Sequence, residues 1–371
     1  MAKVAFIDVT TTISYGGIQT AVWSLAQVIT SKGHDVTVVG GSSAERREYP
    51  DGVRRLTFPY IARTRFPNFG NRFRKLAERL SFAYYARRSV QNERFDWIIL
   101  TKPFDFFWPR IIGKNTRTRF AFMSGGTDFV ALDRYFAPHI DAWLACSHFN
   151  AWQIQTRYRR FPKVMFNGVD TTIFKPGNGS ILRETLGLVK DDIVFAYAGR
   201  IVGWKGLTYA IEALAHPELA GIPVKLLLVG NGPSVSTLRT RAIQLGVVER
   251  IVFHAAVPHQ SLPGFYAASD IGIFPSIGDE AFGITIAEAM SCGKAVIASH
   301  IGGIPEVVGN EESCGIVVPP ADVAALAKAM SKLAISPELR KRMGQASRTR
   351  IEHLFTWTAA ADRLLGALEL P

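Results

Sequence analysis

Apolar residues along the chain follow two alternating patterns. Short, mainly apolar runs such as residues 3–9 (KVAFIDV) and 35–41 (DVTVVGG) are typical of strands buried on both faces of a sheet. Between them, residues 16–33 carry apolar side chains at helical spacing and end at Gly33, a residue type that commonly follows a helix. A strand, a glycine-containing loop, a helix and a second strand in this order predict the start of a parallel, doubly wound sheet.

The same alternation runs through the rest of the chain, with one interruption. Further buried strands are predicted at 95–103, 118–126 and 142–149. Residues 161–180 contain Pro, Asn-Gly and Pro-Gly turns without helical periodicity and are predicted to be a connector. Two α/β domains in tandem, with a ligand cleft between them, are therefore expected. After the connector, strands are predicted at 192–200, 224–233, 250–257, 270–276, 294–299 and 314–320, and helices at 206–216, 234–246, 262–269, 283–293, 322–334 and 356–370.

Length and composition fit this two-domain organisation. At roughly 150 residues per domain, a chain of 371 residues is expected to fold as two domains. No apolar run reaches the roughly 18 residues of a membrane-spanning helix. The N-terminus lacks the apolar core and cleavage site of a signal peptide, so the cytoplasmic compartment is expected. Cys146, Cys292 and Cys314 have no CxxC spacing and are expected to be partly buried thiols rather than zinc ligands.

Excess positive charge is confined to the N-terminal half. Residues 1–170 carry 25 Lys and Arg against 13 Asp and Glu, whereas the remainder has 18 of each. The excess is densest in residues 63–90, where Arg and Lys alternate with Phe, Tyr and Leu. Three interpretations are open: an anionic membrane surface, a solvated helix face with arginine stems over apolar surface, and nucleic acid. The mixture of basic and aromatic residues favours the membrane surface, and no nucleic-acid partner is expected.

Three loops after predicted strands combine glycine with groups that can bind phosphate. Gly16 and Gly17 precede a helix, whose free amides and dipole can bind a phosphate, although an ordinary tight turn has the same pattern. In AGRIVGWKG, Arg200 follows a strand and Lys205 precedes a helix. Two fixed cations there would neutralise a diphosphate leaving group, and two surface cations are the plain alternative. The turn VGNGP can admit a close ligand near Asn231, but such turns are common.

The segment GDEAFGITIAEAM, residues 278–290, has two carboxylates on either side of an apolar run. If a helix begins at about Gly283, its first amides lack intrahelical partners and can bind phosphate oxygens. Glu280 then lies in the preceding loop, within reach of a sugar's hydroxyl groups. Glu288 lies about one and a half turns into the helix and can bond a ribose. A helix-start acid and a surface acid are the plain alternative.

In this order, the motifs resemble the retaining glycosyltransferases of family 4, which have the GT-B fold. The E-x7-E spacing of Glu280 and Glu288 is that family's signature. The resemblance covers nearly the whole chain and is most specific over residues 165–310. The matching pieces are the early GG, NGVD (167–170), GRxxxxKG from Gly199, VGNGP, EAFGITIAE, GGIPEVV (302–308) and FTW (355–357).

The resemblance implies two doubly wound, Rossmann-like domains that face a central cleft. Residues 1–172 would bind the acceptor, residues 173–355 would bind the nucleotide-sugar, and residues 356–371 would form a helix that returns to the N-terminal domain. The implied enzyme is a hexosyltransferase-type glycosyltransferase that uses a UDP- or GDP-linked donor and a glycan or lipid-linked acceptor. It would act in cell-envelope polysaccharide, lipopolysaccharide or glycolipid synthesis, in the cytoplasm or on the inner face of the cytoplasmic membrane.

The resemblance also implies roles for individual residues. Arg200 and Lys205 would hold the diphosphate, and Glu280 would bond the hydroxyl groups of the transferred sugar; these three are the expected catalytic residues. Glu288 would bond the ribose, and Gly17 would close over the diphosphate from the other domain. The full expected donor site is Gly16, Gly17, Asn231, Gly232, Phe282, Gly283, Ile284, Thr285 and Glu288, with the base beside residues 229–233 and 253–257.

The implied chemistry needs neither a protein nucleophile nor a metal. Departure of the diphosphate builds negative charge, which fixed cations and helix-start amides stabilise. The family retains the anomeric configuration through attack on the same face of the sugar, with the leaving phosphate as base. The sequence has no DxD motif to hold a metal, so no metal or other cofactor is expected.

One position departs from the family pattern. Many relatives have a His in an HGxD-like turn, where it contacts the donor sugar. This chain has FMSGGTDF, with Gly125 in place of the His. Ser124 or Asp128 is the candidate replacement for this sugar or acceptor contact, and helix capping is the alternative role for Asp128. A sugar-nucleotide epimerase of the same fold and a non-catalytic nucleotide-sugar-binding protein therefore stay open as alternatives.

Overall fold

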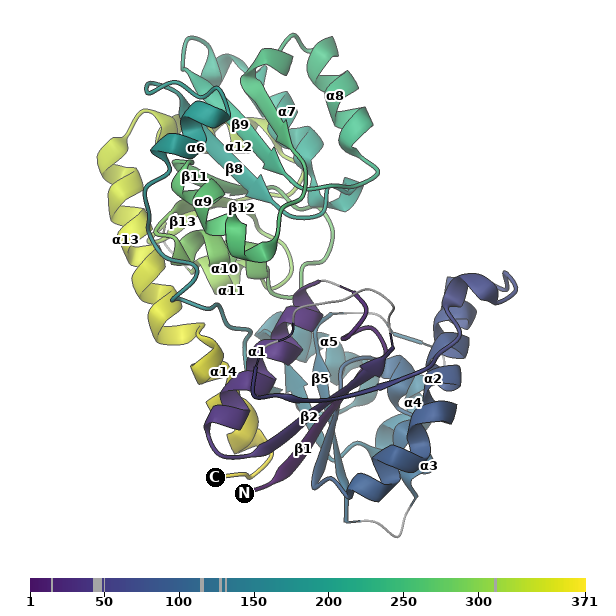
Figure 1. The fold of residues 1–371 in the computed structure, drawn as a ribbon. Helices are drawn as coiled ribbons and strands as arrows, with labels where there is room; N and C mark the ends of the chain where they lie inside the picture. Colours follow the sequence, from purple (N-terminus) through teal and green to yellow (C-terminus); the bar gives the residue numbers. More distant parts are fainter. Residues whose placement is uncertain are drawn as a thin grey trace. The chain divides into compact units, whose positions relative to one another are not determined.

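The structure consists of two compact units (Figure 1). It is a computed structural model that describes residues 1–14, 16–42, 49, 51–113, 117–126, 129–130, 132–309 and 312–371. Unit 1 comprises Met1–Asn167 and Trp357–Pro371, and unit 2 comprises Gly168–Thr356. Each unit is built around one parallel sheet.

The described strands of unit 1 form a seven-stranded parallel sheet of order β3-β2-β1-β4-β5-β6-β7. The strand order reverses between β1 and β4, the position at which doubly wound sheets bind ligands. Strands β1, β2 and β4 are buried almost throughout, which explains their continuous apolar runs. The bounds are β1 Lys3–Ile7, β2 Asp35–Gly41, β3 Arg54–Phe58, β4 Trp97–Leu100, β5 Arg119–Ser124, β6 Ala142–Ala145 and β7 Lys163–Val164.

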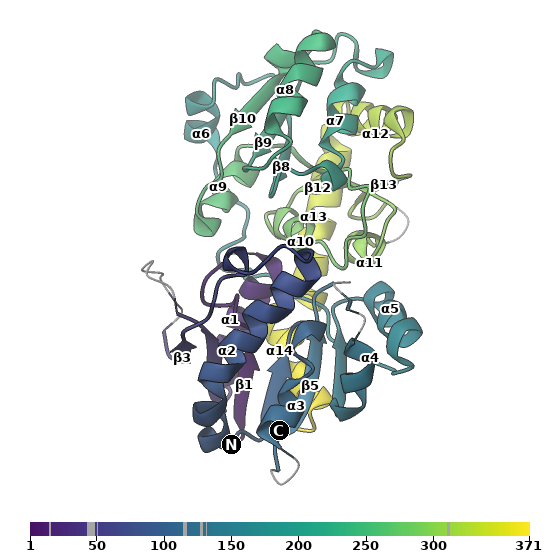
Figure 2. The ribbon, with the colours of Figure 1, turned by 90° about the vertical axis from the view of Figure 1, so that its right-hand side faces the viewer.

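Helices cover both faces of this sheet. On one face, α1 (Gly17–Ser31) and α14 (Trp357–Ala367) share a hydrophobic core with the strands. On the other face, α2 (Asn71–Glu93), α3 (Trp108–Ile112) and α5 (His148–Tyr158) lie over a second core, and Figure 2 looks onto this layer. The short elements of the unit are η1 Arg63–Arg65, η2 Pro103–Asp105, α4 Asp133–Phe136 and η3 Ala137–His139.

Unit 2 has a six-stranded parallel sheet of order β10-β9-β8-β11-β12-β13 among its described strands. Its strands are β8 Ile193–Ala198, β9 Val224–Val229, β10 Ile251–His254, β11 Ile271–Phe274, β12 Ala295–Ser299 and β13 Gly315–Val318. Its helices are α6 Ser180–Thr185, α7 Leu207–Leu214, α8 Val235–Gln244, α9 Leu262–Ala267, α10 Ile284–Ser291, α11 Ile304–Val308, α12 Val323–Ala334 and α13 Pro337–Leu354. The 3-10 turns are η4 Gly203–Lys205, η5 Pro217–Leu219, η6 Val248–Arg250 and η7 His259–Ser261.

The predicted alternation of strands and helices is confirmed, with two kinds of difference. Each predicted strand contains an observed one, but the predictions run too far, because residues such as 199–200 and 230–233 form loops beyond the strand ends. Strand β3 lacks an apolar run since most of its residues are exposed at the edge of the sheet. It was therefore not predicted, and neither was the two-residue strand β7, which lies in the segment 161–180 that was predicted to be a connector. The three cysteines are all buried, and none of the described helices is long and apolar enough to cross a bilayer.

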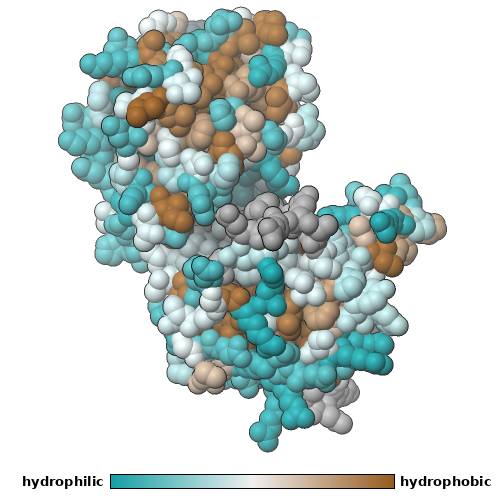
Figure 3. Space-filling model, in the orientation of Figure 1, coloured by the Kyte–Doolittle hydropathy of each residue, from teal (hydrophilic) through white to brown (hydrophobic). Residues whose placement is uncertain are grey.

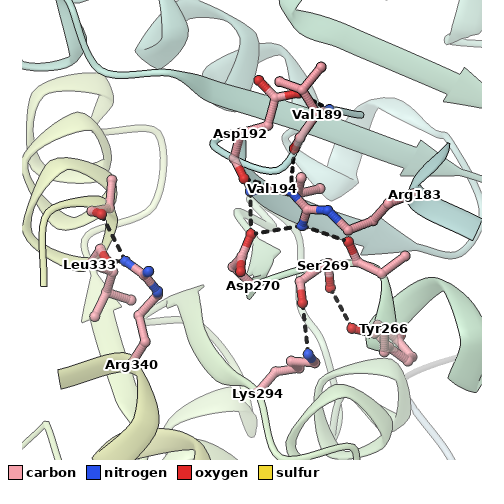
Figure 4. A network of polar contacts seen from close by, with 12 residues as sticks. Arg183, Val189, Asp192, Val194, Tyr266, Ser269, Asp270, Lys294, Leu333 and Arg340 are labelled. Carbon is pink, nitrogen blue, oxygen red and sulfur yellow. Dashed lines mark hydrogen bonds and ion pairs between the residues drawn. The ribbon is translucent and has the colours of Figure 1, made fainter. Parts of the chain in front are cut away.

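A polar network fixes the beginning of unit 2 to its sheet (Figure 4). The guanidinium group of Arg183, on α6, donates to the carbonyls of Ala268, Val189 and Asp192 at 2.7–3.1 Å and lies 3.3 Å from the carboxylate of Asp270. The same Asp270 oxygen accepts the amide of Val194, the second residue of β8, at 2.8 Å. One arginine thus joins α6 to acceptors in two segments, residues 189–192 and 268–270, which are far apart in sequence.

Replacing Arg183 with Met is expected to destabilise unit 2 by about 2–4 kcal/mol, because Asp270 loses its cationic partner and three carbonyls each lose a donor. Urea unfolding of the full chain measures the change. The exposed neighbour Lys190 provides the matched control, and Lys190→Met is expected to unfold like the unmodified chain. Equal midpoints for the two variants would mean that the network contributes nothing to stability.

Candidate functional site

The loops that follow the strands of unit 2 meet at one edge of its sheet, because the described strands are all parallel. Backbone hydrogen bonds join them directly. The amide of Ile201 donates to the carbonyl of Asn231 at 2.9 Å, that of Gly230 to His254 at 2.9 Å, and that of Ile277 to Trp204 at 2.8 Å. This edge carries the cations and carboxylates that the sequence predicts for the donor site.

Lys205 and Glu280 form an ion pair at this edge. Their side chains are 13% and 18% exposed, and the ammonium group also lies 4.4 Å from the centre of the Trp204 ring. The Tyr197 hydroxyl donates to the carbonyl of Arg200 at 2.9 Å. Burial raises the pKa of Tyr197, the charge of Glu280 raises it further, and that of Arg200 opposes this. Arg200 and Glu280 therefore both interact with the buried phenol of Tyr197, and Lys205 joins them through its ion pair with Glu280.

Two glycines allow the loops beside Glu280 and Lys205 to touch. Gly302 has φ +61°, and a Cβ there would lie 2.1 Å from the carbonyl oxygen of Glu280, which accepts the amide of Gly303 at 2.8 Å. Gly206 has φ +67°, and a Cβ there would lie 1.8 Å from the carbonyl oxygen of Pro275. Only glycine fits both positions, so the GG of GGIPEVV holds the backbone of Glu280 in place.

Helix α10 begins at Ile284, directly after Gly283 with φ +95°. The first amides of a helix have no intrahelical acceptor, and the helix dipole makes this end positive. The neighbouring Phe282 is buried and packs against the ring of Phe355, with centroids 5.5 Å apart. Its side chain therefore anchors the loop, and its place in the predicted donor site rests on its backbone. The carbonyl of Thr285 accepts the hydroxyl of Tyr266 at 3.2 Å.

Glu288 is 3% exposed and pairs with a residue that the sequence did not single out. Its Oε1 lies 2.6 Å from Nε2 of His259, in the loop after β10. Burial works to lower the pKa of His259, but the hydrogen bond and charge of Glu288, with the charge of Asp170, raise it above its usual value. One feature of the sequence could have identified His259. It follows the strand predicted at residues 250–257, and the loops after parallel strands are where polar groups meet a ligand.

The VGNGP turn is explained first by backbone packing. A Cβ at Gly230 would lie 1.9 Å from the carbonyl oxygen of Gly199, and one at Gly232 would lie 1.9 Å from that of Ile201. The side-chain oxygen of Asn231 accepts the amide of Ala256 at 3.2 Å. These contacts fix the loop that carries Arg200. A ligand contact at Asn231 and Gly232 stays a prediction.

The predicted residues of unit 1 lie at the corresponding edge of its own sheet. Gly16 precedes α1, and Gly17 is its first residue; both are exposed. Ser124 ends β5, is buried, and donates to the carbonyl of Gly126 at 3.1 Å. A Cβ at Gly125 would lie 2.7 Å from the Ile18 side chain, so a larger residue there would press on the start of α1. Asp128 lies outside the described residues.

A buried charge network supports this loop region and was not predicted. Asp8, directly after β1, accepts Thr101 Oγ1 at 2.6 Å, both the amide and hydroxyl of Thr10 at 2.8 Å, and Arg79 Nη2 at 3.1 Å. The other terminal nitrogen of Arg79 pairs with Asp105. The Thr10 hydroxyl in turn accepts the side-chain amide of Gln19 at 2.9 Å. Hydrogen bonds thus connect α2 to the first turn of α1.

Two carboxylates share one guanidinium group in this network, with opposite effects on their acidity. Burial works to raise the pKa of Asp8, but Arg79 and the hydrogen bonds from Thr101 and Thr10 hold it below its usual value. Burial raises the pKa of Asp105 to about 7; Arg79 opposes this rise and the charge of Asp8 adds to it. Asp8 is therefore the ionised partner, and Asp105 holds its proton up to near neutral pH.

Both units match family models of glycosyltransferases. Residues 180–350 match the model described as Glycosyl transferases group 1, and residues 15–173 match that of Glycosyltransferase Family 4. The D-inositol 3-phosphate glycosyltransferase of Saccharomonospora viridis is 35% identical over 208 residues, which is 53% of this chain and 47% of that protein. The chain thus spans about half the length of the curated relatives it matches.

Two solved structures share the fold over the whole chain. Sucrose-phosphate synthase from Thermosynechococcus elongatus has a TM-score of 0.83 at 21% identity, over 100% of this chain and 98% of its own. Anabaena HepE, solved in complex with UDP and glucose, has a TM-score of 0.81 at 20% identity, over 100% of both chains. With the two parallel-sheet, Rossmann-like units, these likenesses confirm the predicted GT-B fold.

Asp105→Asn is expected to stabilise unit 1 at alkaline pH and to have little effect in acid. A carboxyl whose pKa is raised to about 7 on folding holds a proton that the unfolded chain has lost, so its contribution to stability falls as pH rises from about 4 through 7. An Asn side chain does not titrate, so its contribution to stability does not fall as pH rises. The melting temperature of the variant minus that of the unmodified chain should therefore increase by several degrees between about pH 5 and about pH 8.

Asp8→Asn gives the opposite test in the same network. Because the folded state lowers the pKa of Asp8, its ionised form stabilises unit 1 at neutral pH, and its replacement should lower the melting temperature there. If the melting temperature of each variant differs from that of the unmodified chain by the same amount at every pH, the assignment of the proton to Asp105 is wrong.

Gly302→Ala is expected to cost unit 2 more than about 2 kcal/mol, because a strained φ and a clash with the carbonyl of Glu280 act together. Gly246 is the matched control, since its φ is +69° but a Cβ there would meet no atom within 4 Å. Gly246→Ala should cost only about 1 kcal/mol. Chemical unfolding of both variants measures the difference in the free energy of unfolding. Equal losses in the two variants would mean that the close approach of Gly302 to Glu280 does not contribute to stability.

Proposed function

We propose that this protein is a retaining glycosyltransferase that moves a sugar from a UDP- or GDP-linked donor to a glycan or lipid-linked acceptor. The observation that carries the proposal is the Lys205–Glu280 pair near Arg200, in the unit that matches Glycosyl transferases group 1. The acceptor is an intermediate of cell-envelope polysaccharide, lipopolysaccharide or glycolipid synthesis. The reaction belongs to the hexosyltransferase type.

The ion pair leaves binding capacity for the donor. An ammonium group has three donors, so Lys205 can keep Glu280 and also bind an oxygen of the diphosphate. The pair uses Oε2 of Glu280, and its Oε1 has no hydrogen-bond donor within the described residues. That oxygen is available to a hydroxyl of the transferred sugar. Arg200, which is exposed, supplies the second cation for the diphosphate.

Glu288 is suited to a ribose because its carboxylate is buried and already oriented. His259 occupies Oε1 at 2.6 Å, which leaves Oε2 for the ribose hydroxyl groups. The raised pKa of His259 makes its ring more often positively charged than an isolated imidazole, which strengthens its contact with the Glu288 carboxylate. His259 is therefore a positioning residue for the ribose contact.

The proposed site must stabilise the negative charge that develops on the departing diphosphate. When the bond from the anomeric carbon to the diphosphate breaks, negative charge grows on the phosphate oxygens. Arg200, Lys205 and the amides at Gly283, Ile284 and Thr285 stabilise it, and we propose that the reaction needs no metal and no other cofactor. The leaving phosphate accepts the proton of the acceptor hydroxyl, which attacks from the same face, so the configuration is retained without a protein nucleophile.

The relatives support a nucleotide-sugar donor. HepE was solved with UDP and glucose, and the relative in S. viridis is named as a D-inositol 3-phosphate glycosyltransferase. We assign the contacts of Gly16, Gly17, Asn231 and Gly232 to the same donor. Ser124 remains the candidate for the sugar or acceptor contact, since Gly125 has no side chain.

Contact with an anionic membrane through residues 63–90 is part of the proposal. The apolar side of α2, with Phe82, Ala83 and Ala86, faces the core of unit 1, so this side does not enter a bilayer. The exposed side carries Tyr84 and Tyr85 beside basic residues. Figure 3 shows hydrophobic and hydrophilic residues mixed at the projecting start of this segment. A peripheral position on the inner face of the cytoplasmic membrane suits a lipid-linked acceptor.

A panel of UDP, GDP and ADP with their common sugars tests the donor site by thermal shift. A nucleotide at 100 times its dissociation constant should stabilise the fold by about 2.7 kcal/mol. Glu280→Gln should keep the shift caused by the nucleotide and lose the extra shift caused by the sugar. Asp279, its exposed neighbour, is the matched control, and Asp279→Asn should keep both shifts.

The outcomes separate the alternatives. Transfer of the sugar with retention, measured by NMR of the product, supports the proposal. Epimerisation of the donor without an acceptor would identify a sugar-nucleotide epimerase, and donor binding without turnover would identify a binding protein. If no nucleotide shifts the melting temperature, the assignment of residues 278–290 to a donor is wrong.

A further inference from the structure

Two adjoining hollows lie at the end of α5 in unit 1, outside the residues assigned to the donor. One, of about 270 Å³, is lined mainly by Arg134, Pro138 and residues 156–160. The other, of about 290 Å³, is lined by Trp152, Gln155, Thr156, Arg159 and Phe161. Thr156 and Arg159 line both, so the two hollows adjoin and are together named here the α5 depression.

The α5 depression carries positive charge without counter-charge. Arg134, Arg159 and Arg160 are exposed, and none of them has an ion-pair partner in the part of the chain that the structure describes. A fourth arginine, Arg157, is held by Asp133 at 2.8 Å and by the carbonyl of Val130 at 2.7 Å. Like charges gathered on one small surface repel each other, and a bound anion removes that repulsion.

Large aromatic side chains stand beside these arginines. Trp152 is 61% exposed and Phe161 is 83% exposed, although both are bulky enough to be buried in most proteins. Trp beside basic residues is typical of surfaces that meet the headgroup region of a bilayer, where the ring lies among the lipids and the cation meets phosphate. A small soluble anion gives no reason for the exposed rings.

The helices of the surrounding layer carry no exposed, unpaired carboxylate among the described residues. The helices α2, α3, α4 and α5 and the turn η2 carry four acids, Glu78, Glu93, Asp105 and Asp133. Two exposed acids, Asp96 and Asp141, lie outside these elements, directly before β4 and β6. Glu78, Asp105 and Asp133 are buried, and Glu93 pairs with Arg54 and Lys3. Arg110 of α3 lies 4.4 Å from the ring centre of Tyr135 on α4, so these two helices are in contact. An anionic surface that approaches the helices α2 to α5, which Figure 2 shows from outside, meets no unpaired carboxylate on them.

We propose that the α5 depression binds the phosphate of an anionic phospholipid, with Arg134, Arg159 and Arg160 around the headgroup and Trp152 and Phe161 in the lipid interface. The membrane-binding surface of unit 1 then has two parts, residues 63–90 and the α5 depression. The second part does not depend on sugar transfer, because the lipid is a docking site and not a substrate.

Co-sedimentation of the full chain with vesicles tests this site. The vesicles are phosphatidylcholine alone and phosphatidylcholine with phosphatidylglycerol. Arg159→Gln/Arg160→Gln should weaken binding to the anionic vesicles by about 30-fold, and Trp152→Ala should weaken it by several-fold. The matched control is Lys341→Gln/Arg342→Gln, which removes two exposed cations from α13 and should bind like the unmodified chain. Equal melting temperatures of all variants show that each has folded.

Each other outcome overturns the proposal. Unchanged vesicle binding in the arginine variant, with loss in Tyr84→Ser/Tyr85→Ser, would mean that residues 63–90 alone meet the membrane. Stabilisation by inorganic phosphate without vesicle binding would identify a site for a soluble anion. Binding of RNA in place of vesicles would identify a nucleic-acid surface, and equal losses in the α5 and α13 variants would show an unspecific effect of net charge.

Discussion

Direct contact between the backbones of neighbouring loops is the constraint on which the site in unit 2 depends. At Gly206, Gly230, Gly232 and Gly302, a Cβ would lie about 2 Å from a carbonyl oxygen of another loop. Loops packed this closely cannot shift independently of one another. The side chains of Arg200, Lys205 and Glu280 therefore project from a rigid backbone. A rigid backbone allows charged groups to stabilise a bound ligand without first rearranging.

The two units use charge at the same edge of their sheets in different ways. In unit 2, Lys205 and Glu280 are partly exposed, and each retains capacity for a ligand. In unit 1, Asp8, Arg79 and Asp105 are buried and satisfied by one another and by neighbouring hydroxyl groups. A ligand cannot reach such groups, so they hold loops in place. Unit 1 accordingly presents Gly16 and Gly17 at this edge of its sheet, whereas unit 2 presents the side chains of Arg200, Lys205 and Glu280.

The order of strands and helices, the GT-B fold and the gathering of Arg200, Lys205 and Glu280 follow from sequence, because each depends on local patterns and on the parallel arrangement of strands. Burial could not be predicted in the same way. Arg79 belongs to the basic segment 63–90, yet it is buried between carboxylates that are far from it in sequence. His259 was missed for the same reason, since only the folded chain brings it to Glu288. A lone charged residue does not show its partner in the sequence.

Helix α14 has a consequence for the order in which the protein is made. Its residues Trp357, Ala361 and Leu364 belong to the same hydrophobic core as Val22 and Leu25 of α1. The ribosome produces the whole of unit 2 between these two halves of one core. Unit 1, the first to emerge, therefore waits with part of one face of its sheet uncovered until residues 357–368 arrive, whereas unit 2 is complete at Thr356. The domain that begins first is the one that is finished last.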